Sequence, residues 1–441
     1  MICTFRVGPY LQNLTDSSVT VLWRSVTAVV GVVEFGFDTS YQFRIAELVP
    51  DTMHRVTLGA LVPDTVYHYR VISGTDTSND ATFSTSVGRD KPFRFIVYGD
   101  NRTDSAAHQA LINRMRQTSP PPQLLFNVGD LTENSTTAEY YTFFNIERNI
   151  LNRYVLFPAP GNHDIRTPDN WFNFFALPGT ERWFTVRYGN AAFHIIDNYT
   201  DFTPGSVQYN WLLAELQADS ANPALRHIFV ILHEPPWTTN ARHSSNLMVR
   251  QYLCPLFEQF RVTIAFQGHI HAYEHSLVNG VHYIITGGGG APLHSSWDSA
   301  QTWTVYREAT YEICVVDVRG DSVISYGVRP DGSVFDSLIH ISSGVSDFNP
   351  IAAPKSSAIA VIPQPATREV QIHFYLAQGA RVQLTIYDPS GREIANLADR
   401  WFPAGVNCVI WVPPSNLPAG VYFCNQRIGN RVISLTVLLM R

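Results

Sequence analysis

Lysine is nearly absent from this chain of 441 residues, because Lys91 and Lys355 are the only two and arginine carries almost all of the positive charge. Charged residues make up only 15% of the chain, and the formal net charge is −6. A chain with this balance has no general attraction for nucleic acid or for anionic membranes. Any binding of an anionic group must therefore depend on local contacts.

Long hydrophobic runs are also missing. None approaches the roughly 20 residues that a membrane-spanning helix needs, so we expect no span. The start of the chain shows no signal-peptide pattern, which leaves two alternatives: a cytosolic protein, or an exported one whose leader is missing from this sequence.

Cysteine is scarce and lacks the CxxC spacing of a zinc ribbon. The five cysteines are Cys3, Cys254, Cys314, Cys408 and Cys424. Cys408 and Cys424 belong to the same short C-terminal stretch and could pair as a disulfide if the compartment is oxidising. The other three are expected to be free thiols.

The chain is too long for a single core, and its patterns divide it. Residues 1–88 alternate apolar and polar positions, which predicts an antiparallel sandwich. In residues 92–342 strands alternate with helical segments, which predicts a largely parallel sheet with both faces covered. Residues 343–362 are rich in Ser, Ala and Pro, as in a linker, and 363–441 return to strand patterns. The helical segments are 106–117, 136–148, 207–219 and 246–260.

Five apolar runs in the second domain end in polar clusters. The clusters are Gly99-Asp100, Gly129-Asp130, Gly161-Asn162-His163-Asp164, His233 and Gly268-His269-Ile270-His271. Because alternate side chains of a strand point the same way, we expect the two histidines of the last cluster to face one pocket. Open α/β sheets place their sites beyond the carboxyl ends of the strands, so all five clusters are predicted to converge.

The order GD, GD, GNHD, H and GHxH resembles the metallophosphoesterase superfamily, and the residues around it resemble its purple-acid-phosphatase-like branch. The resemblance covers residues 93–342. It implies a calcineurin-like four-layer α/β/β/α sandwich, here flanked by two all-β, immunoglobulin-like sandwiches.

Both flanking domains have their own resemblances. The segment Gly8-Pro-Tyr-Leu-Gln and the stretch 61–70 resemble the fibronectin-III-like domain of purple acid phosphatases. Pro363-Gln-Pro-Ala and the stretches 387–394 and 417–423 resemble the C-terminal sorting domain of the type IX secretion system. The alternative for this last module is a plain immunoglobulin-like appendage. A sorting domain implies export through the secretion machinery. We give this resemblance more weight than the absence of a signal-peptide pattern in the first residues.

The resemblance implies a pair of metal ions, Fe, Mn or Zn, bridged by Asp130. One ion would take Asp100, Asp130 and His271, and the other would take Asp130, Asn162, His233 and His269. Three positions depart from the family pattern: Arg102 replaces a His of many relatives, Glu133 replaces the Tyr of purple acid phosphatases, and His275 replaces an Arg. Glu133 either supplies a substitute oxygen ligand or leaves that metal loosely held, and His275 is expected at the rim or surface.

The same resemblance assigns further roles. His163 would be the general acid, with Asp164 orienting its imidazole and raising its pKa. His243, with Arg242, lies at the spacing of a substrate-facing His pair. For Arg102 and Arg242 we expect either a phosphate clamp or a plain surface role. Trp237, directly after a ligand loop, is our prediction for a wall of the pocket.

These features predict a secreted or cell-surface dinuclear-metal phosphohydrolase, in which a hydroxide made at the metal pair attacks small phosphomonoesters. One alternative is a phosphodiesterase or nucleotide pyrophosphatase of the same fold, and another is a cell-surface binding protein without turnover. The absence of a basic tract disfavours a nucleic-acid substrate. The oligomeric state is left open.

Overall fold

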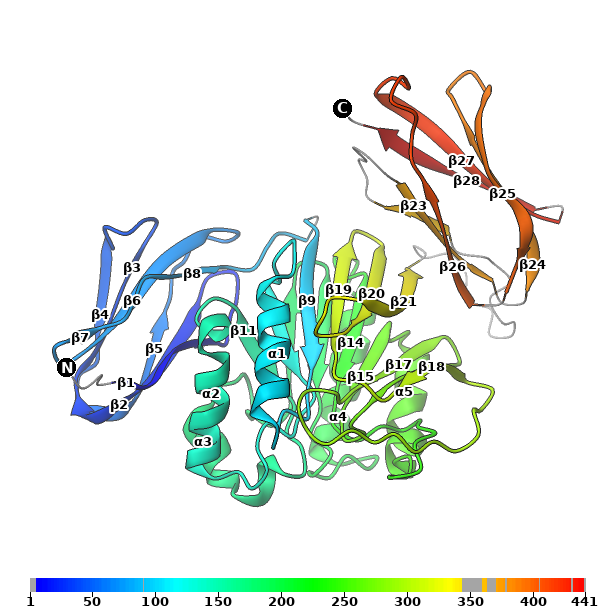
Figure 1. Cartoon of the computed structure of the whole chain (residues 1–441). Coiled ribbons are helices and arrows are strands. Elements are labelled where there is room, and N and C mark those ends of the chain that lie inside the picture. The colour runs from blue at the N-terminus through cyan, green and yellow to red at the C-terminus, as the bar shows by residue number, and fades with distance from the viewer. Residues whose placement is uncertain are drawn as a thin grey trace. The chain divides into compact units, whose positions relative to one another are not determined.

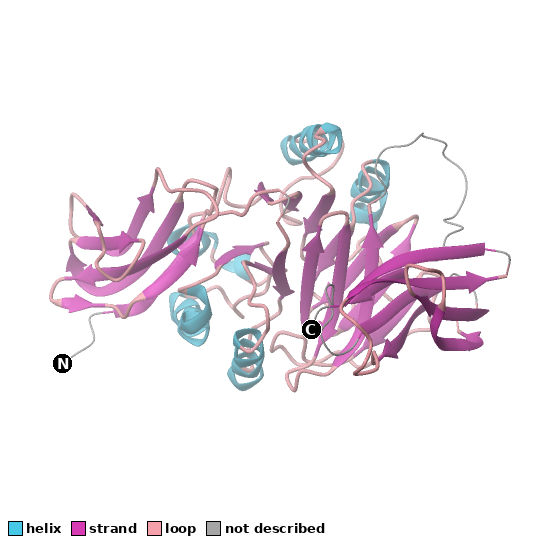
Figure 2. Cartoon of the chain, turned by 90° about the horizontal axis from the view of Figure 1, so that it is seen from above, coloured by secondary structure: helices cyan, strands magenta, loops and turns pink. Residues whose placement is uncertain are grey.

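The structure is a computed structural model that describes residues 5–89, 91–342, 359–362, 370–376, 379–403, 405–429 and 431–439. The chain divides into two compact units, Met1–Asp336 and Ser337–Arg441 (Figure 1). Strands dominate both units, and helices lie only in the first among the described residues (Figure 2). None of those helices is long and apolar enough to cross a membrane.

The first unit begins with two antiparallel sheets. One contains β1 (Phe5–Gln12), β2 (Val19–Val29) and β5 (Asp51–Leu58); the other contains β3 (Gly31–Gly36), β4 (Phe43–Ala46), β6 (Val66–Ser73), β7 (Asp76–Thr77) and β8 (Ala81–Ser84). Alternate residues of β6 are buried, as the sequence pattern predicts. The Trp23 indole donates a hydrogen bond to the Ser73 hydroxyl at 2.8 Å and so joins the two sheets.

These N-terminal sheets contact the helical part of the same unit through polar groups. The Tyr10 hydroxyl donates to the carbonyl of Phe174 at 2.6 Å, and the Tyr69 hydroxyl donates to the carbonyl of Asn152 at 2.9 Å. The Arg24 guanidinium lies 4.2 Å from the centre of the Phe174 ring. The N-terminal strands are therefore anchored at the helices that follow the second and third polar clusters.

The middle of the chain contains two larger sheets. The six-stranded sheet has the order β11 (Val155–Pro158), β10 (Leu124–Asn127), β9 (Phe93–Tyr98), β19 (Ile313–Arg319), β20 (Ser322–Val328), β21 (Val334–Ile341). The seven-stranded sheet has the order β12 (Phe184–Tyr188), β13 (Ala191–Ile195), β14 (His227–Ile231), β15 (Ile264–Gln267), β17 (Val281–Thr286), β16 (Tyr273–Val278), β18 (Thr304–Glu308).

Both sheets are mixed. Parallel pairing joins β9, β10 and β11 in one sheet and β13, β14, β15 and β17 in the other. The pairings of β19 with β9 and of β16 with β17 are antiparallel. The prediction of one largely parallel sheet is therefore wrong, because later strands return as hairpins that periodicity cannot assign to a second sheet.

Helices cover the outer faces of the two sheets, so the four-layer α/β/β/α arrangement is confirmed (Figure 2). The helices are α1 (Ser105–Arg116), α2 (Thr137–Leu151), α3 (Pro168–Phe174), α4 (Val207–Ala221) and α5 (Cys254–Gln259), with a 3-10 turn at Asp164–Arg166 and a π-helical turn at Val249–Leu253. Asp104 caps α1, and Thr136 with Glu139 forms a capping box on α2. The π-helical turn at Val249–Leu253 interrupts the predicted helix 246–260.

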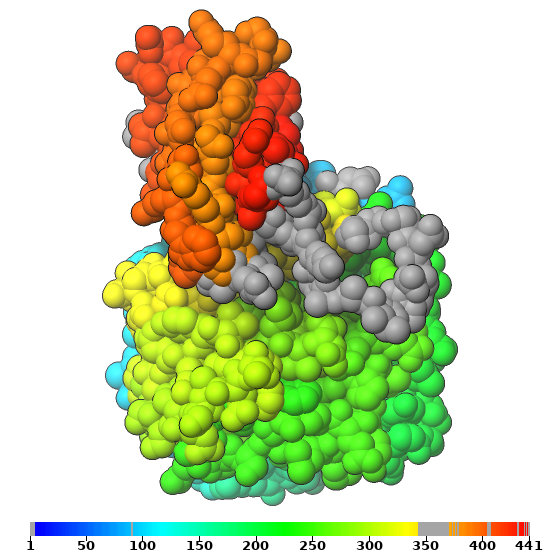
Figure 3. Space-filling view, turned by 90° about the vertical axis from the view of Figure 1, so that its right-hand side faces the viewer, coloured from blue at the N-terminus to red at the C-terminus, as the bar shows by residue number. Residues whose placement is uncertain are grey.

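The C-terminal unit is all antiparallel β in its described parts and is coloured orange to red in Figure 3. Its strands are β22 (Ile359–Ile362), β23 (Val370–Leu376), β24 (Ala380–Tyr387), β25 (Glu393–Phe402), β26 (Gly405–Trp411), β27 (Gly420–Ile428) and β28 (Arg431–Leu439). Most of the predicted linker 343–362 lies outside the described residues, and its last four residues form β22.

The disulfide that Cys408 and Cys424 could form is not present. Cys424 is a free, buried thiol on β27. Burial raises the pKa of this thiol to about 12. The two cysteines lie on strands of different sheets, which sequence proximity within one module does not reveal.

Phe95 of β9 joins the six-stranded and seven-stranded sheets, since its ring centre lies 5.1 Å from that of Phe193 and 5.0 Å from that of Phe229. We expect Phe95→Ala to lower the free energy of unfolding by about 3–5 kcal/mol, because a cavity would open between the sheets. Urea denaturation followed by fluorescence measures this. Phe172→Ala, whose side chain is 38% exposed, is the matched control and should cost about 1 kcal/mol or less. Equal losses in both variants would contradict the role of Phe95.

Candidate metal centre

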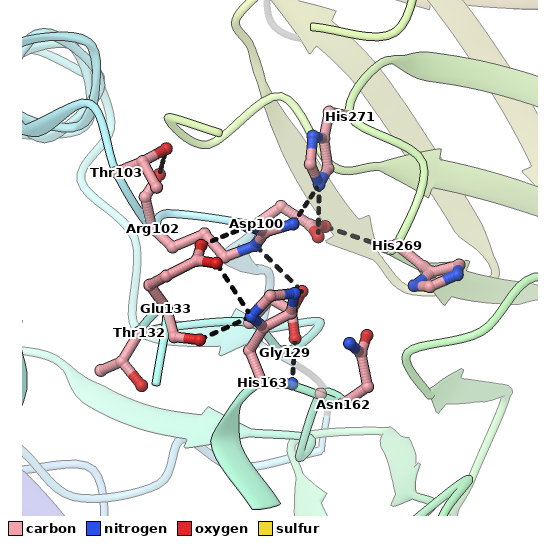
Figure 4. Close-up of polar contacts among 12 residues, drawn as sticks. Asp100, Arg102, Thr103, Gly129, Thr132, Glu133, Asn162, His163, His269 and His271 are labelled. Atoms are coloured by element: carbon pink, nitrogen blue, oxygen red, sulfur yellow. Dashed lines mark hydrogen bonds and ion pairs between the residues drawn. The ribbon is translucent and has the colours of Figure 1, made fainter. Parts of the chain in front are cut away.

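The five polar clusters converge at one edge of the two sheets, as the sequence predicts. Asp100 and Asp130 follow β9 and β10 of the six-stranded sheet, and His233, His269 and His271 follow β14 and β15 of the seven-stranded sheet. Figure 4 shows several of these side chains pointing toward one another from both sheets. The site is therefore assembled across the sheet interface.

Left-handed backbone conformations turn three of these residues into the site. Asp100, Asp130 and His269 have φ angles of 56°, 57° and 66°. Such conformations are uncommon for residues other than glycine and cost of order 1–2 kcal/mol each. His269 and His271 therefore point to neighbouring positions because the backbone turns after β15, and the strand alternation assumed from sequence does not explain them.

The first of two neighbouring positions is defined by Asp130, Asn162, His233 and His269, and we call it the His233 position. The Nε2 atom of His233 lies 3.3 Å from the Asn162 amide oxygen and 3.5 Å from Asp130 Oδ1. The other His233 nitrogen bonds the carbonyl of Val128 at 2.7 Å, which directs Nε2 into the site. The His269 ring centre is 5.2 Å from that of His233. Carboxylate, amide and imidazole donors of this kind suit a transition metal.

The second position lies among Asp100, Asp130 and His271, and we call it the Arg102 position because that side chain enters it (Figure 4). Arg102 Nε donates to Asp130 Oδ2 at 3.2 Å, and its Nη2 lies 3.1 Å from His271 Nε2. Its Nη1 donates to the carboxylate of Glu133. Two of the expected ligand atoms are thus already bonded to a guanidinium.

The buried imidazoles of His269 and His271 are neutral near pH 7. Burial, with smaller effects from neighbouring His233 and His243, lowers the pKa of His269 to about 2. Burial, and then His294, lowers the pKa of His271 to about 3. A neutral imidazole keeps the lone pair that a metal ligand needs, so these residues can bind a metal without first losing a proton.

Buried acidic groups lie at the centre of the site. Asp100 is fully buried, and burial together with the nearby Asp130 holds the pKa of its carboxyl well above the usual range. Its Oδ1 atom is buried without a hydrogen-bond partner. Ligand atoms of Asp100, Asp130 and His233 all lie within 4.8 Å of one another. An unpartnered carboxylate oxygen inside such a group fits a metal ion, which would allow Asp100 to ionise.

Asp164 has a different role from the one expected. Its carboxylate accepts hydrogen bonds from the backbone amides of Asp130, Leu131 and Gly161, at 2.8, 3.0 and 2.9 Å. The His163 imidazole instead bonds the carbonyl of Glu133 through Nδ1 at 2.6 Å. The prediction that Asp164 orients His163 is therefore wrong. Asp164 fixes the backbone loops that carry the other groups.

His243 and Arg242 lie on the open side of the centre. The His243 ring centre is 4.5 Å from that of His269 and 5.2 Å from that of His294. Burial, and then the charge of Arg242, lowers the pKa of His243. Arg242 itself is exposed. Both residues can therefore meet a ligand that approaches from solvent.

His294 is a site residue that the sequence analysis missed. It stacks on His271 with ring centres 4.0 Å apart, and its Nδ1 accepts the backbone amide of His271 at 3.2 Å. Its only sequence signal is its place shortly after the run of four glycines, and an isolated histidine in a loop gives no spacing to interpret.

Two other expectations need correction. Trp237 packs in the apolar cluster under α4 and α5, with the Arg250 guanidinium 3.8 Å from its ring centre, so the contacts found for it are with the core rather than a pocket wall. His275 is buried at 2% exposure and bonds Asp336 at 2.9 Å, so it is no rim residue. Both errors arise because distance along the chain from a ligand does not give side-chain direction.

The run Gly287 to Gly290 permits close backbone approach. A Cβ atom on Gly287 would lie 2.2 Å from the Ile270 carbonyl oxygen, and one on Gly289 would lie 2.0 Å from the Gly99 carbonyl oxygen. The buried Glu312 carboxyl accepts the Gly288 amide at 3.1 Å and the Thr286 hydroxyl at 2.8 Å. The loop thus touches the segments that carry Asp100 and His271.

Comparison with known proteins agrees with this architecture. Residues 93–273 match the family model described as calcineurin-like phosphoesterase. A purple acid phosphatase from yellow lupin seeds has a similar structure, with a TM-score of 0.66 and 18% identity over 75% of this chain and 73% of that one. The structure titled PhoD gives 0.61 and 12% identity over 78% and 91%. Residues 93–273 therefore have the calcineurin-like phosphoesterase fold.

The curated relatives of this chain include purple acid phosphatases. Purple acid phosphatase 1 of Ipomoea batatas is 25% identical over 57% of this chain and 62% of its own length. A nucleotide pyrophosphatase/phosphodiesterase of Hordeum vulgare is 23% identical over 60% of this chain and 90% of its own. A protein named probable inactive purple acid phosphatase 27, from Arabidopsis thaliana, is 23% identical over 59% of this chain and 52% of its own. The chain spans about half the length of several such relatives.

A pH effect on stability follows from Glu312. Burial raises the pKa of its carboxyl to about 8, against roughly 4.3 in the unfolded chain. Between these values the unfolded state has lost a proton that the folded state keeps, so stability falls as the pH rises through this window, by roughly 5 kcal/mol in total. Urea denaturation at several pH values should show this slope in the parent chain and a flatter profile in Glu312→Gln. The exposed Asp169→Asn is the control and should retain the slope. A Glu312→Gln profile parallel to the parent would contradict the prediction.

Proposed function

We propose that this chain is a metal-dependent hydrolase of phosphate esters that prefers small phosphomonoesters. The observation that carries the proposal is the group formed by the buried Asp100 and Asp130 with the imidazole of His233 and the neutral imidazole of His269. Neutral nitrogen donors beside paired carboxylates suit a metal ion that activates a water molecule and polarises a phosphoryl oxygen. The similarity to purple acid phosphatases supports the substrate class.

The ligands in this proposal are the four residues of the His233 position, joined by Asp100, and the metal is Fe, Mn or Zn. The Asn162 amide oxygen lies 3.3 Å from His233 Nε2, a separation that supports their binding to the same ion. Bonds from second residues fix these donors: His233 through the carbonyl of Val128, and Asp130 through the backbone amide of His163 at 2.9 Å. Such fixed donors keep ligand atoms in place before a metal arrives.

His163 is the proposed proton donor to the leaving group. Its Nδ1–H is committed to the Glu133 carbonyl, so Nε2 is the atom that faces the centre, 3.7 Å from Asp130 Oδ2. Only the imidazolium form carries a proton on Nε2 when Nδ1 donates elsewhere. In that form His163 can protonate the departing oxygen.

The open side of the centre would bind the rest of the substrate. His243, His294 and the exposed Arg242 surround the approach to His269. A guanidinium suits bidentate contact with phosphate. A phosphodiesterase would need additional room there for a second ester group.

We also propose that the protein is exported. The support is the resemblance of residues 363–441 to type IX sorting domains and the all-β character of the described part of that unit. The N-terminal sheets, with their resemblance to the fibronectin-III-like domain of purple acid phosphatases, would serve as a support for α2 and α3.

The experiment that tests the function compares hydrolysis of a chromogenic phosphomonoester with that of its bis-ester, after addition of Mn, Fe or Zn. Faster monoester turnover supports the proposal, and faster bis-ester turnover would assign a phosphodiesterase instead. Asp130→Asn is expected to abolish turnover and metal retention while preserving the fold, as circular dichroism would show. A folded chain without turnover under every metal would favour the binding-protein alternative.

His163→Ala should keep metal content and lower kcat by about 10²–10⁴-fold for esters with poor leaving groups, and by much less for nitrophenyl esters. The reason is that a good leaving group departs without a proton. Measuring kcat over a series of phenyl phosphates tests this. Equal losses across the series would remove His163 from the donor role.

A further inference from the structure

We propose that the Arg102 guanidinium takes the place of one of the two metal ions, so that the centre binds a single metal ion per chain. This inference rests on the phosphohydrolase function proposed for the same site. It goes beyond that function because it assigns the second positive charge of the centre to the polypeptide.

The contacts of Arg102 are those that a cation in this position would make. Its guanidinium bonds Asp130 Oδ2 at 3.2 Å and His271 Nε2 at 3.1 Å, and it also pairs with Glu133. The His271 Nδ1 atom bonds the carbonyl of Pro292 at 2.7 Å, so Nε2 is the lone-pair nitrogen that accepts from Arg102. All three partners therefore present acceptor atoms to one positive group.

This cation is permanent and enclosed. Arginine does not lose its proton in proteins, and the Arg102 side chain is only 14% exposed. A divalent ion on the same acceptor atoms would lie against the guanidinium, where two positive charges a few ångströms apart repel strongly at the low effective dielectric of a buried site. Glu133, which replaces the family's tyrosine, holds the guanidinium from the outer side. Arg102 and Glu133, which both depart from the family pattern, are thus bonded to each other.

Asp100 then serves the remaining metal. Its Oδ1 atom has no hydrogen-bond partner, and its Oδ2 accepts the backbone amide of His269 at 2.9 Å. Because ligand atoms of Asp100, Asp130 and His233 fit within 4.8 Å, one ion can use both carboxylates. Asn162 and His269 complete this set.

Arg102 also retains donors for a substrate. A guanidinium has five N–H groups, and the three contacts above use three of them, one on each nitrogen. The remaining two, on Nη1 and Nη2, are available to phosphoryl oxygens beside the metal. The guanidinium would thus stabilise charge that the second metal stabilises in a dinuclear centre.

The test is metal stoichiometry of the full chain, by elemental analysis after loading with Mn²⁺ and by electron paramagnetic resonance of the same sample. We expect one equivalent per chain and the six-line signal of an isolated Mn²⁺ ion. Two equivalents with a spin-coupled signal would overturn the inference and leave the proposed function standing. No bound metal together with no turnover would overturn both.

Arg102→His is expected to raise the content from one equivalent to two, because it supplies a neutral ligand where the fixed charge was. Arg102→Lys keeps the charge and should stay at one. Arg166→His is the matched control, since Arg166 also contacts Glu133 yet lies outside the ligand atoms, and it should stay at one. An Arg102→His chain that is folded by circular dichroism and still binds one equivalent would contradict the proposed exchange of charge for metal.

Discussion

Mutual repulsion among buried carboxylates is the constraint on which the site depends. Asp100, Asp130 and Asp164 are nearly or fully buried at the ends of neighbouring strands, and no such group can ionise without nearby positive charge or hydrogen-bond donors. Each is compensated differently. Backbone amides surround Asp164, Arg102 and the His163 amide reach Asp130, and Asp100 retains an oxygen without a partner. His163, His233 and His271 lie within 4 Å of these carboxylates.

Much of the fold could be predicted from sequence, because strand ends and turn residues recur in a recognisable order. The runs before Asp100, Asp130 and His233 became strands, and the polar clusters after them met. The division into two mixed sheets could not be predicted, since a buried strand has the same apolar pattern in either sheet. The four-layer arrangement was predicted from the family resemblance, because hydrophobic periodicity alone does not distinguish one sheet from two.

For the site, residue types were easier to predict than side-chain directions. The sequence indicates which groups gather, but Asp164 points at backbone amides and Trp237 at the core, and only coordinates reveal this. His294 reaches the centre through a loop without regular structure. Left-handed backbone at Asp100 and His269 is equally invisible to rules that assume extended strands.

The glycine run has a further meaning once the site is seen to straddle two sheets. Asp100 belongs to one sheet and His271 to the other, and Gly287 and Gly289 touch the backbone beside each at distances that leave no room for a side chain. The separation of the sheets at this edge is therefore set by bare backbone contact. The spacing of the two sheets in the aromatic core is coupled in this way to the distances between the candidate metal ligands. A substitution deep between the sheets can change the distances between the candidate ligands without contacting any of them.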